Sequence, residues 1–286
     1  MKRALTIQQE LTQIHTVEDL TEVFESIASL HIAKIRDRVV ASKEFFTELW
    51  QTYQGLRIDP KAQLARHTQA KKAQDVFVLI TAEGKLSGQI DEQIVEAMQA
   101  AYQTPAQTDI IAIGSHGVAA LRRMGVPIAK SFQLPAGDAN FTVTPIVEEL
   151  NQYRHISVFY QTYESLRVQK VAHIELISAV RELGEAAKEE QQVVSSRDYI
   201  FEPNIDQIAD YMESVMMGVA LGQVIMESKL AQYASRFNAM STAKRRAMDL
   251  VVDYRHQYYR AKRAETDERL KEMIKVIKYR GHSRTN

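Results

Sequence analysis

The chain has 286 residues, a formal net charge of zero and no cysteine, and 45% of its residues are hydrophobic. The lack of cysteine excludes disulfides, Cys-ligated zinc, iron–sulfur clusters and thiol catalysis, and the zero net charge excludes a global attraction to nucleic acid. No apolar run approaches the roughly 18 residues of a membrane-spanning helix, and the first residues lack the apolar core of a signal peptide. We therefore expect a chain that stays in the cytoplasm and does not insert into a membrane.

The first 54 residues contain neither glycine nor proline, the residues that most disfavour a helix interior, and predict one very long helix. Its apolar residues recur at spacings of three, four and their sums: Ile7, Leu11, Ile14, Leu20, Phe24, Ile27 and Ile35. That spacing indicates a seam, a line of apolar contacts along one helix face. We expect the helix to end near Tyr53, before Gly55, and assign residues 1–56 to it. A second helix starting at Thr16 is the alternative, because Thr16 and Asp19 form a weak capping pattern.

Residues 72–195 alternate short apolar runs rich in β-branched side chains with helical patterns, which is typical of an α/β layer domain. The predicted strands are 75–81, 109–114, 155–160 and 168–177, and the predicted helices are 91–102 and 118–124. We expect the last two strands to be neighbours and the domain to be Rossmann-like. Residues 183–196 are rich in charged and amide side chains and indicate a solvated loop or a frayed helix.

Residues 223–280 again lack glycine and proline, and they carry a clearer seam. Its positions alternate between spacings of three and four: Leu230, Tyr233, Phe237, Met240, Lys244, Ala247, Val251, Tyr254, Tyr258 and Ala261. A 3.5-residue repeat of this kind sustains a left-handed coiled coil. We assign residues 204–280 to this helix. The predicted fold is α/β with long helices, in which the two terminal helices pair as an antiparallel coiled coil beside a central Rossmann-like domain.

The turn from Thr81 to Gly88 follows a predicted strand and precedes a predicted helix, where phosphate-binding loops lie in α/β proteins. Its glycines, Gly84 and Gly88, match neither the P-loop pattern nor the dinucleotide fingerprint, and Glu83 precedes them. We interpret the segment as a plain strand-to-helix turn and expect no cofactor.

A second turn, Ile113-Gly-Ser-His-Gly117, follows the next predicted strand. Ser115 and His116 are adjacent in sequence, which does not supply the aimed nucleophile–base geometry of a hydrolase. Gly114 and Gly117 therefore indicate a tight turn rather than a catalytic one. The eight histidines are scattered without the spacing of metal ligands, so we expect no metal site.

Charge is unevenly distributed despite the zero total. From residue 227 onward the chain has 15 Lys and Arg against 7 Asp and Glu. An early segment is acidic instead: Glu18, Asp19, Glu22 and Glu25. The basic stretch 255–280 contains tyrosines, as some nucleic-acid-binding segments do, but the acids within it favour a solvated face or a socket for an acidic protein. The basic knot Lys244-Arg245-Arg246 either stays in water or meets carboxylates of a surrounding protein.

Five stretches, in order across nearly the whole chain, resemble the gamma subunit of F-type ATP synthase. They are Leu20–Ser29, Leu79–Asp91, Ile113–Gly117, Tyr160–Ser165, and Tyr199–Pro203 together with Glu227–Met240. The last stretch is the most specific. There the family has Y-x-F-E-P followed by E-S-x-x-S-E-H-A-A-R-M-x-A-M, and this chain has YIFEP followed by ESKLAQYASRFNAM.

The resemblance implies a non-catalytic rotor shaft that transmits torque between a membrane ring and a catalytic head. The implied partners are the alpha and beta subunits of that head, the epsilon subunit and the ring of c subunits, at the cytoplasmic face of the cell membrane. The implied contacts with the alpha/beta hexamer are Asp19, Glu22, Glu25, Lys244, Arg245, Arg246, Arg260 and Arg263. The implied foot domain carries the turns at Glu83, Gly84, Gly88, Gly114 and Gly117.

The chain departs from the family at two places where the shaft grips the beta subunits. The family has basic residues in its early helix, where this chain has Asp19 and Glu22, and its R-Q-A-x-I-T segment is degenerate around 260–264. Either the partner sequences have changed to match, or this is a specialised rotor. Two other function classes stay open: a coiled-coil scaffold with an α/β adaptor domain, and an enzyme that binds a phosphate-bearing ligand at Gly84 and Gly88.

Overall fold

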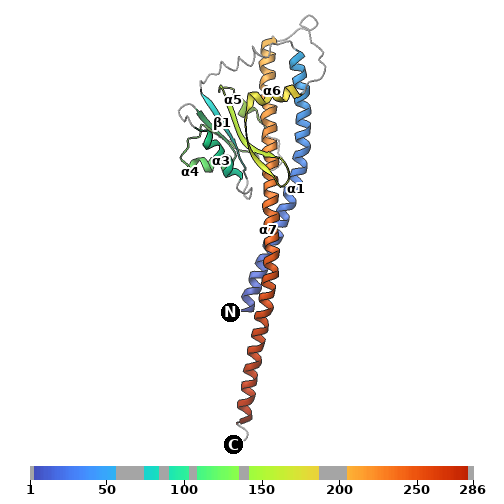
Figure 1. The fold of residues 1–286 in the computed structure, drawn as a ribbon, viewed down its shortest axis with the longest axis vertical. Coiled ribbons are helices and arrows are strands. Elements are labelled where there is room, and N and C mark those ends of the chain that lie inside the picture. The colour runs from blue at the N-terminus through green and yellow to red at the C-terminus, as the bar shows by residue number, and fades with distance from the viewer. Residues whose placement is uncertain are drawn as a thin grey trace. The chain divides into compact units, whose positions relative to one another are not determined.

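The computed structural model describes residues 3–55, 74–83, 90–102, 108–134, 142–186 and 205–282. The helices are α1 (Ala4–Gly55), α3 (Ile90–Ala101), α4 (Ser115–Arg123), α5 (Thr144–Leu150), α6 (Leu176–Ala186) and α7 (Ile205–His282) (Figure 1). The strands are β1 (Asp75–Ile80), β2 (Thr108–Ile113), β3 (Lys130–Phe132), β4 (Ile156–Tyr163) and β5 (Gln169–Glu175). The chain divides into two compact units, Met1–Ile27 with Ala239–Asn286 (unit 1) and Ala28–Asn238 (unit 2).

Each of the two long runs without glycine or proline forms a single helix. α1 continues through Thr16, whose hydroxyl donates to the carbonyl oxygen of Thr12 at 3.0 Å, one turn earlier. The alternative of a second helix that starts at Thr16 is therefore wrong, because the hydroxyl bonds back into the helix instead of capping a new one. α7 runs unbroken from Ile205 to His282.

The two helices pair antiparallel in unit 1, as predicted. The backbone N–H of Ala4 donates to Oε1 of Glu265 at 2.8 Å, and Nζ of Lys244 donates to Oε1 of Glu22 at 3.1 Å. Contacts thus move toward the N-terminus on α7 as they move toward the C-terminus on α1. An apolar cluster fills the end of this pair: Ala4, Ile7 and Ala261, with Tyr254 and Tyr258 packed against them.

The predicted seam of α7 is confirmed in unit 1. Met240, Ala247, Val251 and Ala261 are buried, at the spacings that the sequence indicated. After Glu265 the described side chains of α7 are exposed as far as Val276.

The predicted seam of α1 is wrong in its middle part. Leu20, Phe24 and Ile27 are 52%, 38% and 41% exposed, whereas Thr21 and Ala28 are buried. The least exposed positions recur at a 3–4 spacing, but they carry polar and small residues. The apolar residues chosen from the sequence each lie one position before one of them. One position is about 100° around a helix, so apolarity pointed to the adjacent face.

The same helices also contact each other in unit 2. The rings of His31 on α1 and Tyr233 on α7 stack with centroids 4.5 Å apart. Farther along α1, the hydroxyl of Tyr53 donates to Oε1 of Glu213 at 2.7 Å, and both side chains are buried. The antiparallel direction is therefore the same as in unit 1.

Unit 2 contains a five-stranded sheet in the order β3-β2-β1-β4-β5. β1 pairs parallel with β2 and with β4, β2 pairs parallel with β3, and β5 runs antiparallel beside β4. The α/β alternation and the neighbouring last two strands are as predicted. The strand order reverses between β1 and β4, which is the topological switch point of a doubly wound sheet.

Helices cover both faces of the sheet (Figure 1). One layer packs β1 residues Val76, Val78 and Ile80 against α1, α5, α6 and α7. The other layer packs Leu79 of β1 against α3 and α4. Successive side chains of a strand point to opposite faces, so both faces of β1 are buried and its sequence is a continuous apolar run.

Three elements of unit 2 were not among the predicted ones: β3, α5 and α6. β3 has three residues and α5 has seven, which is too short for a periodic pattern. α6 begins where the carboxylate of Glu175 accepts from the backbone N–H of Ser178 at 3.1 Å, and this cap ends β5 before the predicted residue 177. For segment 183–196 the alternatives were a solvated loop and a frayed helix; residues 183–186 are helical, as the end of α6, and the remainder lies outside the described residues.

Candidate functional site

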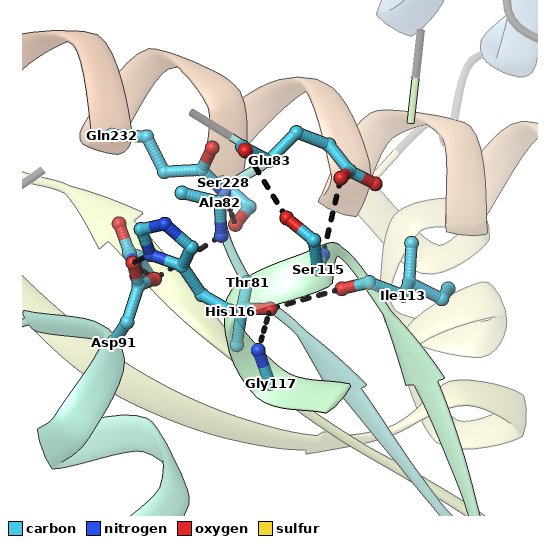
Figure 2. Close-up of polar contacts among 11 residues, drawn as sticks. Thr81, Ala82, Glu83, Asp91, Ile113, Ser115, His116, Gly117, Ser228 and Gln232 are labelled. Carbon is cyan, nitrogen blue, oxygen red and sulfur yellow. Dashed lines mark hydrogen bonds and ion pairs between the residues drawn. The ribbon is translucent and has the colours of Figure 1, made fainter. Parts of the chain in front are cut away.

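A polar cluster joins the carboxyl ends of β1 and β2, and it contains residues 81–83 of the first predicted turn and residues of the second, 113–117 (Figure 2). Gly114 has a φ of +105°, and a β-carbon there would lie 2.2 Å from the carbonyl oxygen of Thr81. Gly117 donates its backbone N–H to Oγ1 of Thr81 at 2.8 Å, and a β-carbon there would lie 2.9 Å from that oxygen. Both positions therefore require glycine for contact with the end of β1.

Glu83 ties the end of β1 to two neighbouring elements. Its carboxylate accepts from the backbone N–H of Ser115 at 3.1 Å and from that of Leu134 at 2.6 Å. The first of these bonds places negative charge at the start of α4, where the helix dipole stabilises it. The second links the residues after β3 to the same carboxylate. Glu83 thus holds the start of α4 and the residues after β3 to the end of β1.

The side chain of Asp91 makes three polar contacts in the cluster. It is 7% exposed and lies in the first turn of α3. Its carboxylate accepts from the backbone N–H of Ala82 at 3.2 Å and from Nε2 of Gln161 at 2.7 Å, and it lies 2.8 Å from Nδ1 of His116. One buried carboxylate thereby joins β1, β4, α3 and α4 at the switch point of the sheet.

Ser115 and His116 do not pair with each other as the nucleophile and base of a hydrolase do. The hydroxyl of Ser115 donates to the carbonyl oxygen of Glu83 at 3.1 Å, and the imidazole of His116 pairs with Asp91. Across the part of the chain that the structure describes, no three His, Cys, Asp or Glu side chains converge as metal ligands do. Gly84 and Gly88 lie outside the described residues.

α7 also makes a polar contact with the sheet of unit 2. The hydroxyl of Thr162 on β4 donates to Oε1 of Glu227. Burial raises the pKa of Tyr160, two residues earlier on β4, to about 12, and the charge of Glu227 acts in the same direction. Beside the turns, Nε2 of Gln232 donates to Oγ of Ser228 at 3.1 Å, and both residues are buried (Figure 2).

Three of the sequence-predicted contact residues come together in unit 1. Nζ of Lys244 lies 3.1 Å from Oε1 of Glu22 and 3.7 Å from Oε2 of Glu25. The hydrogen bond to Glu22 raises the pKa of Lys244, and the charges of the two acids add to the effect. Lys244 occupies a seam position, so the acidic segment of α1 pairs with α7 inside the chain.

The other predicted contact residues do not join this group. They are exposed: Asp19, Arg245, Arg246, Arg260 and Arg263. Residues that the sequence interpretation missed are Asp91, Gln161 and Glu265, each of which holds elements together through side-chain hydrogen bonds. Asp91 could have been found as a buried acid at the start of a helix, whereas Gln161 and Glu265 carry no sequence signal of their own.

Comparison with known proteins identifies the family. The family model described as ATP synthase matches residues 4–277. This chain belongs to the ATP synthase family. A curated relative, the ATP synthase gamma chain of Alkaliphilus metalliredigens, is 22% identical, and the alignment covers 94% of this chain and 95% of the relative. The chloroplastic gamma chain of Trieres chinensis is also 22% identical, with 95% and 83% covered.

Solved structures of the family share the fold. A chain of the mitochondrial ATP synthase of Euglena gracilis, in rotational state 3, superposes with a TM-score of 0.63 at 15% identity, with 95% of this chain and 93% of that chain covered. A central-stalk chain of the Tetrahymena thermophila enzyme gives a TM-score of 0.57 at 18% identity, with 78% and 99% covered. The resemblance to the gamma subunit family, drawn from five sequence stretches, is therefore confirmed. No described helix is long and apolar enough to cross a membrane.

Proposed function

We propose that this chain is the central-stalk rotor subunit of a rotary F-type ATP synthase. It transmits torque between a membrane ring driven by ion flow and the catalytic alpha/beta hexamer. The observation that carries the proposal is the antiparallel pairing of the two chain ends, Ala4 with Glu265 and Glu22 with Lys244, in a chain that the family model matches almost throughout. Paired helices resist bending and twisting better than one, which a torque-bearing part requires.

The proposed partners follow from the same role. Unit 1 meets the alpha and beta subunits of the catalytic head, and the α/β layers of unit 2 form the foot that meets the epsilon subunit and the ring of c subunits. Structural relatives support this assignment, because they come from the rotor and the central stalk with its c-ring.

The chain itself is proposed to be non-catalytic and peripheral, at the cytoplasmic face of the cell membrane. The hydrogen bonds of Ser115 and His116 support the first point, because both side chains serve the turn rather than each other. Nucleotide hydrolysis is left to the catalytic head.

The test is reconstitution with the alpha and beta subunits from the same cell. The full chain is expected to co-purify with the hexamer, to turn over no ATP alone, and to rotate when the hexamer hydrolyses ATP and a bead is fixed to unit 2. A chain that stays monomeric in the presence of its own hexamer would contradict the proposal.

A further inference from the structure

The hairpin formed by β4 and β5 extends beyond the apolar layer that packs the sheet of unit 2 on α7. Within that layer the buried side chains of α7 run from Ala209 to Ile225. On β4, Tyr160 belongs to the same layer, and Thr162, two residues farther along the strand, points to the same face of the sheet. The end of β4 thus presents a polar side chain to the helices that cover this face.

Two hydrogen bonds connect the hairpin with α7 beyond the apolar layer. The hydroxyl of Thr162 donates to Oε1 of Glu227. Farther along, Nδ2 of Asn238 donates to the carbonyl oxygen of Leu166, at the hairpin tip, at 2.6 Å. Positions 227 and 238 are separated by close to three helical turns, so both side chains lie on one face of α7. The hairpin therefore follows that face from β4 to its tip.

The hairpin tip is held in shape by its own hydrogen bonds. The backbone N–H of Glu164 donates to the carbonyl oxygen of Val168 at 3.2 Å, which closes the turn. Nε2 of Gln169 donates to the carbonyl oxygen of Leu166 at 3.0 Å, and that oxygen has a second lone pair for Asn238. The contact with α7 is therefore made by an ordered turn.

These contacts lengthen the attachment of the sheet to α7. At about 1.5 Å per residue, the apolar layer from Ala209 to Ile225 covers about 24 Å of the helix, and the attachment as far as Asn238 covers about 44 Å. A rod that is held over a longer span resists tilting more strongly. Apolar contacts are not directional, whereas hydrogen bonds weaken steeply when their angle changes. The two hydrogen bonds therefore restrict an angle that the apolar layer restricts less.

We propose that the β4–β5 hairpin is a brace that fixes the angle between the sheet and residues 205–238 of α7, and that Thr162, Glu227 and Asn238 are positioning residues for torque transfer. In a rotor, torque applied to the α/β layers reaches α7 through the contacts between them. A firm attachment passes the rotation on, whereas a loose one lets α7 turn or tilt against the sheet first. The inference rests on the proposed rotor function and names the residues that make the attachment firm.

The brace is tested first in the free, full-length chain. Because the chain has no cysteine, spin labels can be attached at Arg167→Cys in the hairpin tip and Tyr211→Cys on α7, both exposed positions, and pulsed EPR gives their distance distribution. Adding Thr162→Val with Asn238→Ala removes both donors and should widen the distribution about twofold, because two directional contacts are lost. The matched control Thr162→Ser keeps the hydroxyl and should leave the width unchanged.

A second measurement uses the chain assembled with its alpha/beta hexamer, with a bead fixed to unit 2. While the hexamer holds the shaft still, the variance of the bead angle reports how firmly unit 2 is attached. Thr162→Val with Asn238→Ala should raise this variance about twofold, and Thr162→Ser should match the unmodified chain.

An unchanged label distribution in the double variant overturns the inference, and so does a Thr162→Ser chain that widens as much as the double variant. If the double variant does not fold, Asn238→Ala alone carries the test, because its bond lies at the exposed tip; its distribution should widen less, and no widening overturns the inference. A chain that shows the expected label distances but binds no hexamer contradicts the rotor function and leaves the brace as a feature of the fold. A chain that binds the hexamer with equal bead variance in both forms contradicts the role in torque transfer alone.

Discussion

Unit 2 and unit 1 are stabilised in different ways. In unit 2, helices bury both faces of a sheet, and residues such as Val78 and Ile111 have no exposed surface. In unit 1, two helices contact each other along one seam. The seam contains buried side chains, such as Ile7 and Ala261, and also the partly exposed Lys244. Unit 2 is a layered core, and unit 1 is a line of contacts with solvent on both sides.

The difference teaches where each unit tolerates change. A layered core leaves no space for an added atom, so the turns that close it depend on glycine. A two-helix seam accepts polar residues because long side chains such as that of Lys244 reach water, or a carboxylate, from a contact position. Substitutions should therefore act through steric fit in unit 2 and through seam contacts in unit 1.

The largest effect is expected at the turn after β2. Gly114→Ala places a β-carbon 2.2 Å from the carbonyl oxygen of Thr81, at a φ of +105°, and should lower the free energy of unfolding of unit 2 by about 4 kcal/mol. Urea unfolding followed by the fluorescence of Trp50, the single tryptophan, measures it. The matched control is Gly125→Ala, which has φ +70° but open space around the new atom and should cost about 1 kcal/mol. Equal losses at the two positions would show that close contact does not limit this turn.

A smaller loss is expected in the seam of unit 1. Ile7→Ala removes buried methyl groups from the cluster with Ala4 and Ala261 and should destabilise unit 1 by about 3 kcal/mol. Circular dichroism at 222 nm should show earlier melting of helix, while the Trp50 transition of unit 2 keeps its midpoint. The exposed neighbour Leu5→Ala should change neither signal. If both signals shift together after Ile7→Ala, the two units unfold as one and do not have separate stabilities.

Removal of the carboxylate at the switch point tests the polar part of unit 2. Asp91→Ala leaves the side-chain amide of Gln161 and the N–H of Ala82 without their acceptor and should cost about 2 kcal/mol, measured by the Trp50 urea midpoint. Glu92→Ala, at the exposed neighbouring position, is the control and should cost less than about 0.5 kcal/mol. A loss that is no larger than the control's would mean that the network is not needed for folding.

The smallest effect is a pH dependence in unit 2. The pKa of Tyr160 is about 12 in the folded chain, against an ordinary value of 10. Below pH 10 the hydroxyl is protonated in both states, and between pH 10 and 12 only the unfolded chain loses the proton. Stability should therefore fall by about 1–2 kcal/mol across that interval, measured as urea midpoints at stepped pH.

Tyr160→Phe should remove that part of the decline, whereas Tyr211→Phe, at a position that is 71% exposed, should leave it unchanged. A decline that is identical in all three chains would show that other groups titrate there.

Sequence patterns predicted much of the fold because they reflect local physics. Absence of glycine and proline predicted both long helices, and the apolar run Val76 to Ile80 predicted a buried strand, since each depends on neighbours along the chain. The regular seam of α7 was also predicted, because its residues are apolar or small at nearly every contact position. The turns at Gly114 and Gly117 were recognised from glycine following a strand.

The candidate site was less accessible to sequence reasoning. Asp91 and Gln161 are 70 positions apart and meet only because α3 begins at the edge of the sheet where β4 ends. The basic knot was left open between water and carboxylates of another protein, whereas Lys244 pairs with acids 222 and 219 positions away in its own chain.

The sequence by itself determined the two long helices, the apolar strands, the antiparallel pairing of the chain ends and the family, because these depend on local propensity and on motifs in order. Tertiary structure decided which face of α1 is the seam. Thr21 and Ala28 are buried and Leu20 and Ile27 are exposed because α7 packs along the face that carries Thr21 and Ala28, and a contact line depends on both helices. Apolarity alone marks two faces of α1, and only the paired helix shows which of them is buried.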